Sequence, residues 1–346
     1  MKSIPATNAA LMLSTWMILG CGGSGPVTPP SPPTPAAAES QVPAKVADQV
    51  PTDVASSSPA ASQPAKTLRW MFQAGDTLNY SIELKQTQKF GPNVLATSTT
   101  NEDITCVVDS VDVDGLAQIT RTVNRLQFKL DGLLGKIDYD STSDKEPEGA
   151  TWLTMRPMMM AMKNGVYTFK LSPRGQFSDI VLPEVVLSLI SENPALAQQL
   201  GVSEETAKEE AMELELFLPA DAVSSNASWT LKKEPSKQPH GMVQAELTFT
   251  YQGTEERETR SLEKLVLAGK YDVQPDPDAL MKGKPYTSQG VYYFDSIAGR
   301  MVEARTTATW GMEISQAGQV IEMTTENTKT FKLKPAGDSA APKPGE

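Results

Sequence analysis

Residues that carry out most enzyme chemistry are scarce in this sequence. It has one histidine, His240, beside Pro239, and two cysteines, Cys21 and Cys106. Histidine is the usual general base and a common zinc ligand, so its scarcity argues against zinc sites and His-based catalysis. No nucleophile-elbow, phosphate-loop, dinucleotide or HExxH motif occurs in the chain. Carboxylates are plentiful, and only geometry could reveal a catalytic pair among them. We therefore expect no enzyme and no cofactor.

Three pairs of aspartates, each with its members two residues apart, invite comparison with calcium sites: Asp112 and Asp114, Asp138 and Asp140, and Asp276 and Asp278. None of the pairs matches the D-x-[DN]-x-[DN]-G spacing of a calcium-binding loop. We interpret all six residues as solvated turn acids and expect no metal there.

Methionines gather in one short segment of the chain. Trp152, Met155, Met159 and Met162 would share one face of a helix, although Pro157 would kink that helix or delay its start. Packing of a short helix on a sheet is the first interpretation. Methionine also fits varied apolar partners, so a lid over an apolar cavity is the functional alternative. Thioethers bind Cu(I) as well, but no histidine or cysteine supports a copper site.

An apolar run precedes Cys21. Lys2 is followed by an apolar stretch that ends at Leu19, and Gly20 stands before the cysteine. A positive start, an apolar stretch of about ten residues and a small residue at the end describe a secretory signal peptide. The run is too short to cross a bilayer, which needs roughly 20 apolar residues. Residues 1–20 are therefore predicted to be removed on export.

The end of this run, Ile18-Leu19-Gly20-Cys21, resembles the lipobox of bacterial lipoproteins, whose cysteine is acylated and becomes the new N-terminus. Leu19 departs from the family pattern, in which a smaller residue precedes the glycine. The resemblance implies a lipid anchor at Cys21 and a domain in the cell envelope, on the periplasmic or extracellular side of a membrane. The alternative is ordinary cleavage near Gly20, which would leave Cys21 free. Cys106 lies in a strand-like run and is expected to be a small buried hydrophobe.

Both flanks of the chain have the composition of disordered segments. Ten of the 26 prolines fall between Gly22 and Lys66, and that stretch contains no aromatic residue. Such a segment cannot bury enough apolar surface to offset chain entropy. We expect residues 21–66 to form an extended spacer behind the anchor and residues 336–346 to form a disordered tail.

The formal net charge of −11 argues against nucleic acid as a partner, because phosphates need a basic surface.

Strand signals dominate from residue 67 onward. Residues 78–85 alternate apolar and polar side chains, and Asp114-Gly115 is a hairpin dipeptide between the runs 104–113 and 116–130. Further strands are expected at 166–171 and 176–180. After Leu218-Pro219 the strands resume, and they end in a hairpin of 300–314 and 319–333.

Helix signals cluster between these two groups of strands. Pro183 opens one helix, a short piece follows over 193–201, and Ser203 caps a third. The order of strands, helices and strands predicts a mainly-β or α+β domain over 67–335. It would have two antiparallel curved sheet halves, at 67–180 and 217–335, arranged as a sandwich or partial barrel. A helical insertion at 181–216 would connect them.

Several short motifs recur in an order that resembles a family of bacterial lipoproteins of unknown function, covering roughly residues 67–333. The motifs are Gly75-Asp76-x-x-x-Tyr80, Val111-Asp112-x-Asp114-Gly115, the turn at Gly175, Leu218-Pro219 with Trp229, and Tyr293-Phe294-Asp295-x-x-x-Gly299-Arg300. The resemblance implies an exported, mainly-β protein behind a lipobox and a proline-rich linker. It brings no activity or catalytic residue. Taken by themselves, these positions indicate turns at Gly and Asp, and core positions at Tyr80 and Trp229.

Together these features favour a membrane-tethered envelope protein that binds without catalysis, with a lipid or other apolar molecule as its ligand. The alternative is a structural or protein-interaction scaffold of the envelope, and an enzyme without a recognisable motif ranks third. The expected partners are the membrane, through the N-terminal lipid anchor, and either an apolar small molecule or an envelope protein. A cavity lined by Met155, Met159 and Met162 would favour the binding module, and a fully packed core would favour the scaffold.

Overall fold

The computed structural model describes residues 65–335, apart from 134, 164, 193, 195–196, 198–202, 213–215, 239–240, 276–280 and 317–318. Several predicted features lie outside the described residues: the leader and Cys21, nearly all of the spacer, His240, Asp276 with Asp278, most of the helical piece at 193–201, and the tail at 336–346.

The first half of the domain folds into antiparallel strands. They are β1 (Thr77–Phe90), β2 (Asn93–Val111), β3 (Ala117–Gly132), β4 (Gly135–Asp140), β5 (Val166–Leu171) and β6 (Phe177–Val181). The turn at Asp114-Gly115 forms between β2 and β3 as predicted. The Asp112 carboxylate accepts hydrogen bonds from the backbone N–H groups of Asp114 and Leu116, and Gly115 has a φ of +80° that favours glycine.

The second half contributes the remaining strands. They are β7 (Ser228–Lys232), β8 (Ser236–Gln238), β9 (Gly241–Arg257), β10 (Arg260–Gln274), β11 (Met281–Gly283), β12 (Tyr286–Asp295), β13 (Arg300–Gln316) and β14 (Gln319–Leu333). The predicted hairpin at the C-terminal end corresponds to β13 and β14, which pair from Glu303 with Lys332 to Gln316 with Gln319.

Pairing of the first long strand with the last joins the two halves into one sheet. β1 lies antiparallel to β14, from Tyr80 opposite Leu333 to Phe90 opposite Met323. The 14-stranded sheet has the order β6-β5-β3-β2-β1-β14-β13-β12-β10-β9-β7, with β4 on β3, β11 on β13 and β8 on β9. The predicted mainly-β or α+β class, with antiparallel curved halves around a helical insertion, is confirmed.

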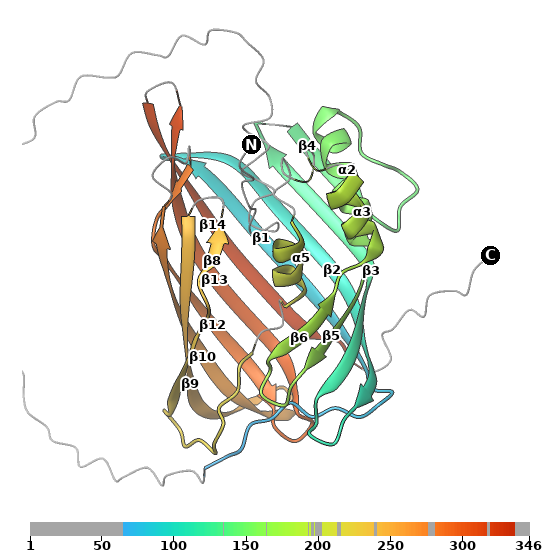
Figure 1. Cartoon of the computed structure of the whole chain (residues 1–346), viewed down its shortest axis with the longest axis vertical. Coiled ribbons are helices and arrows are strands. Elements are labelled where there is room, and N and C mark those ends of the chain that lie inside the picture. The colour runs from blue at the N-terminus through green and yellow to red at the C-terminus, as the bar shows by residue number, and fades with distance from the viewer. Residues whose placement is uncertain are drawn as a thin grey trace, which may run out of the picture.

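The helices lie on the concave side of this curved sheet (Figure 1). They are α2 (Ala150–Lys163), α3 (Glu184–Glu192) and α5 (Glu204–Ala211), of which α2 packs on β3, β4 and α3. The helix starts predicted at Pro183 and Ser203 are confirmed, since the carbonyl of Pro183 accepts from Val186 N–H and that of Ser203 from Ala207 N–H. Among the described helices, none is both long and apolar enough to span a membrane.

Buried apolar side chains form two separate clusters. The main core runs from Leu68 through the inward residues of most strands to Phe331, and it includes Tyr80 and the buried face of α2. Trp229 packs against it, half-buried, and donates its indole N–H to the carbonyl of Phe217. A smaller second cluster lies around the β13–β14 hairpin and contains Met281, Trp310, Met312, Ile314 and Met323. We call the face of the sheet that carries both clusters the inner face.

Two segments differ from expectation. Lys66, predicted as the last spacer residue, pairs its backbone with Val223, so the ordered domain includes it. The first part of β2 was not predicted, because the polar run at 97–103 lacks alternation. It becomes a strand through backbone pairing with β1 on one side and β3 on the other. Neighbouring strands, rather than its own side chains, supply the stabilisation.

Candidate functional site

The methionine-rich segment is a helix seated in the main core. Trp152, Met155 and Met159 are almost completely buried, and Met162 is half-buried against the same core. The ring of Trp152 lies 4.8 Å from that of Tyr139 on β4, measured between centroids. Pro157 is accommodated inside α2. The predicted shared face is therefore present, and of its four residues Met162 is the one with partial exposure.

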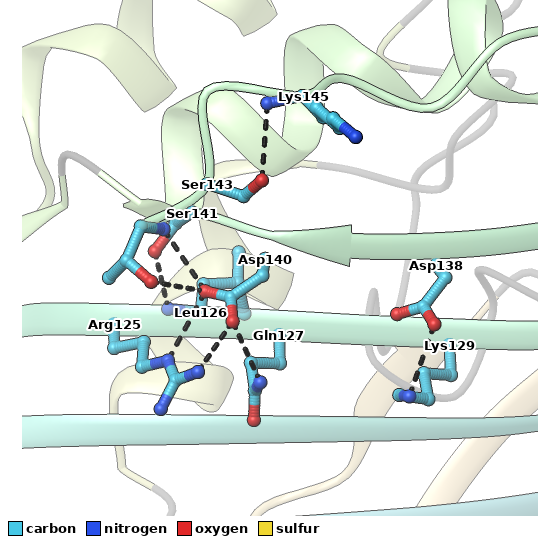
Figure 2. A network of polar contacts seen from close by, with 10 residues as sticks. Arg125, Leu126, Gln127, Lys129, Asp138, Asp140, Ser141, Ser143 and Lys145 are labelled. Carbon is cyan, nitrogen blue, oxygen red and sulfur yellow. Dashed lines mark hydrogen bonds and ion pairs between the residues drawn. The ribbon is translucent and has the colours of Figure 1, made fainter.

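A polar network fixes the chain where it leaves β4 toward α2 (Figure 2). The Asp140 carboxylate accepts hydrogen bonds from Arg125, from Gln127 at 2.9 Å and from the hydroxyl of Thr142 at 2.8 Å. These donors, Arg125 first, hold the pKa of Asp140 well below its usual range. Ser141 reinforces the turn, because its N–H donates to the carbonyl of Leu126 and its hydroxyl accepts from Leu126 N–H.

Two of the other predicted aspartates that the structure describes, Asp138 and Asp112, also have structural partners. Asp138 pairs with Lys129 at 3.1 Å on the sheet surface (Figure 2), and Asp112 stabilises the β2–β3 turn. Within the described part of the chain, no group of three or more His, Cys, Asp or Glu residues is arranged to hold a metal ion. Cys106 is buried, and burial raises the pKa of its thiol to about 11.

Five polar side chains form a layer on the inner face, which we call the inner polar row: Gln86, Gln88, Ser288, Thr325 and Asn327. Each is at least nine-tenths buried. On β1 and β14, Gln86 lies opposite Asn327 and Gln88 opposite Thr325. Ala308 of β13 lies between Asn327 and Ser288 in register. Since neighbouring strands are about 4.8 Å apart, Asn327 and Ser288 are about 10 Å from each other.

Three atoms of the inner polar row lack hydrogen-bond partners: Ser288 Oγ, Thr325 Oγ1 and Asn327 Oδ1. The Ser288 hydroxyl lies above Gly269, its register partner on β10, where an added Cβ would collide with it. A buried polar group without a partner costs about 1–3 kcal/mol. Such groups are rare in folded proteins, and each needs an explanation such as strain, a water or ion, or a functional role.

The inner polar row separates the two apolar clusters, as β14 alone illustrates. Its inward residues run from Phe331 in the main core, through Lys329, Asn327 and Thr325, to Met323 in the second cluster. Lys329 adds a half-buried positive charge, with its Nζ 5.3 Å from the centroid of the Phe331 ring. The inner polar row thus places uncharged donors and acceptors beside the Lys329 cation, with buried apolar side chains on both sides.

A second buried polar group, around Glu263 on β10, has all of its partners. One carboxylate oxygen accepts from Lys66 at 2.6 Å and Ser296 at 2.8 Å, and the other from Tyr251 at 2.6 Å and Thr254 at 3.0 Å. Burial acts to raise the pKa of Glu263, but these donors together bring it below its ordinary value. Because the carboxylate is saturated with donors, we assign this group a structural role.

The inner polar row was not recognised from the sequence. Its signal is present in β14, where alternate residues change from apolar Ile321 and Met323 to polar Thr325 and Asn327, and then return to apolar Phe331. Polar residues at inward positions of an otherwise alternating strand are the pattern to search for. Thr325 and Asn327 lie in one row with Ser288 and Gln86 because strands far apart in the chain pair with one another.

Comparison with known proteins gives little beyond this geometry. No protein-family model matches the chain, and no curated protein matches it. Among solved structures, DynF from the dynemicin biosynthesis pathway of Micromonospora chersina aligns over 81% of this chain and 92% of its own, with 9% identity and a TM-score of 0.21. A Bacteroides fragilis protein described as exported, with a YmcC-like fold, aligns over 78% and 98%, with 10% identity and a TM-score of 0.24. Neither likeness carries an argument about function.

Proposed function

We propose that this chain is an exported, lipid-anchored protein of the bacterial cell envelope that binds an amphiphile on the inner face of its sheet without transforming it. The inner polar row would hold the polar head, and the neighbouring apolar clusters would contact the apolar part. The observation that carries this proposal is the presence of three buried, unpartnered polar atoms on β12 and β14.

The chemistry of the row indicates what kind of head group it would accept. Ser288 and Thr325 each offer a hydroxyl that donates and accepts, and Asn327 offers a free carbonyl oxygen. A head group with several hydroxyl or amide groups would satisfy all three. A ligand of this kind would recover the desolvation cost of about 1–3 kcal/mol per unpartnered atom.

Buried apolar side chains that the rest of the ligand would contact lie beside the row. Met323, Trp310 and Met312 lie on one side, and Phe331 on the other. Methionine side chains adapt to varied apolar shapes, so the second cluster would suit an alkyl chain. Among the predicted lid residues on α2, Met162 is half-buried, whereas Trp152, Met155 and Met159 are enclosed by core.

Replacing Thr325 by valine tests the binding proposal. Thr325→Val keeps the shape of the side chain and removes the unpartnered hydroxyl, so we expect the unfolding free energy of the ligand-free protein to rise by about 1–3 kcal/mol. Octyl glucoside, used below its critical micelle concentration, should raise the Tm of the wild-type protein and raise that of the variant much less. A gain in stability together with a loss of binding is the expected signature.

Thr309→Val is the matched control, because Thr309 is exposed on the opposite face of the adjacent strand β13. It should leave both stability and octyl glucoside binding nearly unchanged. If Thr325→Val instead destabilises the protein and leaves binding intact, the hydroxyl has a structural partner and the amphiphile proposal fails. The scaffold function would then be preferred.

The lipid anchor is tested separately at Cys21. Cys21→Ser should abolish acylation and release the protein from the membrane fraction, because stable anchoring requires acyl chains. Mass spectrometry of the mature N-terminus gives the direct readout. An unmodified N-terminus, at Cys21 or any later residue, would contradict the proposal.

A further inference from the structure

The outer face of the sheet carries a groove of about 780 Å³, lined by residues of β9, β10, β12 and β13. Val266 and Val291, which lie opposite each other in register, form an apolar part of its lining. This volume lies within the range of about 300–1,000 Å³ typical of small-molecule sites. The groove is distinct from the inner polar row, because its side chains alternate with the inward ones along the same strands.

Charged residues around the groove leave one positive charge unbalanced. Lys264 Nζ lies 3.0 Å from Glu255 Oε2. Arg257 Nη2 lies 3.0 Å from Glu303 Oε2. Arg305, exposed on β13, makes no hydrogen bond or ion pair with any residue that the structure describes. A chain with a net charge of −11 therefore presents a groove whose free charge is positive.

The side of the groove next to Arg305 is a wall formed by Arg257, Tyr293 and Glu255, and contacts among these residues hold it in place. The guanidinium carbon of Arg257 lies 4.1 Å from the centroid of the Tyr293 ring, and the Tyr293 hydroxyl donates to Glu255 Oε1 at 3.2 Å. Tyr293 is buried beneath these groups although it points to the outer face. Such a wall would not need to reorganise when a ligand binds, which reduces the entropic cost of binding.

We propose that this outer groove is a second binding site, for a phosphate or carboxylate group carried on a small apolar body. Arg305 receives the oxyanion, because the planar guanidinium offers paired donors that match both groups. Val266 and Val291 contact the apolar body. Charge complementarity selects the anion, and the lining selects against fully hydrated ions such as free phosphate.

Phenyl phosphate is the first probe, with binding measured by isothermal titration calorimetry at low ionic strength on the full mature chain. Arg305→Gln should weaken its affinity at least tenfold and leave the Tm unchanged, since the side chain has no described structural contact. Arg260→Gln is the matched control: it removes the same charge from an exposed arginine of β10 outside the groove, and it should leave the affinity within twofold.

Three further probes sharpen the result. Inorganic phosphate and benzyl alcohol should each bind at least tenfold more weakly than phenyl phosphate, because each lacks one of the two recognised parts. Benzoate tells which oxyanion is preferred, and comparable binding of benzoate and phenyl phosphate agrees with the proposal. Thr325→Val should not alter phenyl phosphate binding, which separates this groove from the inner site.

Two outcomes would overturn the outer site. Equal weakening by Arg305→Gln and Arg260→Gln would show that the probe responds only to overall charge. Failure of phenyl phosphate and benzoate to bind the wild-type protein would show that the groove is not a site. Neither result would bear on amphiphile binding by the inner polar row, which is tested with octyl glucoside.

Discussion

Glu263 and Thr325 are equally buried, at 1% and 0% exposure, yet their surroundings differ. Both oxygens of Glu263 accept two hydrogen bonds each, from residues of three separate segments. The Thr325 hydroxyl has none, and neither do Ser288 Oγ and Asn327 Oδ1 in the same row. A saturated polar group stabilises the fold only while all of its partners remain. An unsaturated one weakens the fold and needs another explanation, for which we propose ligand binding.

The comparison predicts that mutations in the two regions change the unfolding free energy with opposite signs. The largest change is expected in the Glu263 network. Glu263→Ala leaves Lys66, Tyr251 and their neighbours without their shared acceptor, so we expect a loss of about 3–5 kcal/mol in unfolding free energy. Urea denaturation measures it. Glu256→Ala, at an exposed position of β9, is the control and should change stability by less than about 0.5 kcal/mol. A small loss for Glu263→Ala would show that the network is not structural.

Met159→Ala tests whether α2 belongs with the packed region or with the binding region. If Met159 only fills core, the substitution should cost about 2–5 kcal/mol and leave octyl glucoside binding unchanged. Leu153→Ala, on the exposed side of the same helix, should cost far less. A small cost together with altered octyl glucoside affinity would instead place α2 over unfilled space, as a lid.

Acid titration should also distinguish the two regions. The folded-state pKa of Glu263 is below its ordinary value, so its stabilisation is fully present above the unfolded pKa of about 4.3 and is lost as pH falls toward the folded value. The difference in unfolding free energy between wild type and Glu263→Gln should therefore be constant near neutrality and shrink below about pH 4.3. The corresponding difference for Thr325→Val should show no such titration, because no ionisable group is changed.

Lys329→Met should have the smallest effect on stability, within about 1 kcal/mol, because the side chain is half-buried and its stem can be replaced by an apolar one. It should weaken binding of octanoate about tenfold, equivalent to 1.4 kcal/mol, and leave octyl glucoside binding unchanged. Equal weakening of both amphiphiles would mean that Lys329 shapes the site and does not select charge.

Much of the architecture could be predicted because short-range patterns specify it. The strands at 166–171 and 176–180 correspond closely to β5 and β6, since a turn at Ser172–Gly175 separates two short runs of strand-forming residues. The helix starts at Pro183 and Ser203 follow from the preference of these residues for the first helical position and the cap. The shared face of Trp152, Met155 and Met159 follows from helical periodicity alone.

The inner polar row was decided only by tertiary structure. Gln86, Ser288 and Asn327 are separated by up to 241 positions in the sequence, and they share one row because β1 pairs with β14 and β13 with β12 in a particular register. A shift of that register by one residue would move each of them to the other face. No local pattern in the chain states which strands become neighbours.

The sequence by itself determined which side chains could point inward along each strand and where the chain would turn, because both depend on residues within a few positions of one another. Tertiary structure decided which inward polar residues found partners. Glu263 did, through Lys66 and Ser296, whereas Ser288, Thr325 and Asn327 did not. Whether a buried polar atom has a hydrogen-bond partner depends on atoms that folding brings together from distant segments. For this reason the candidate site became recognisable only in the folded chain.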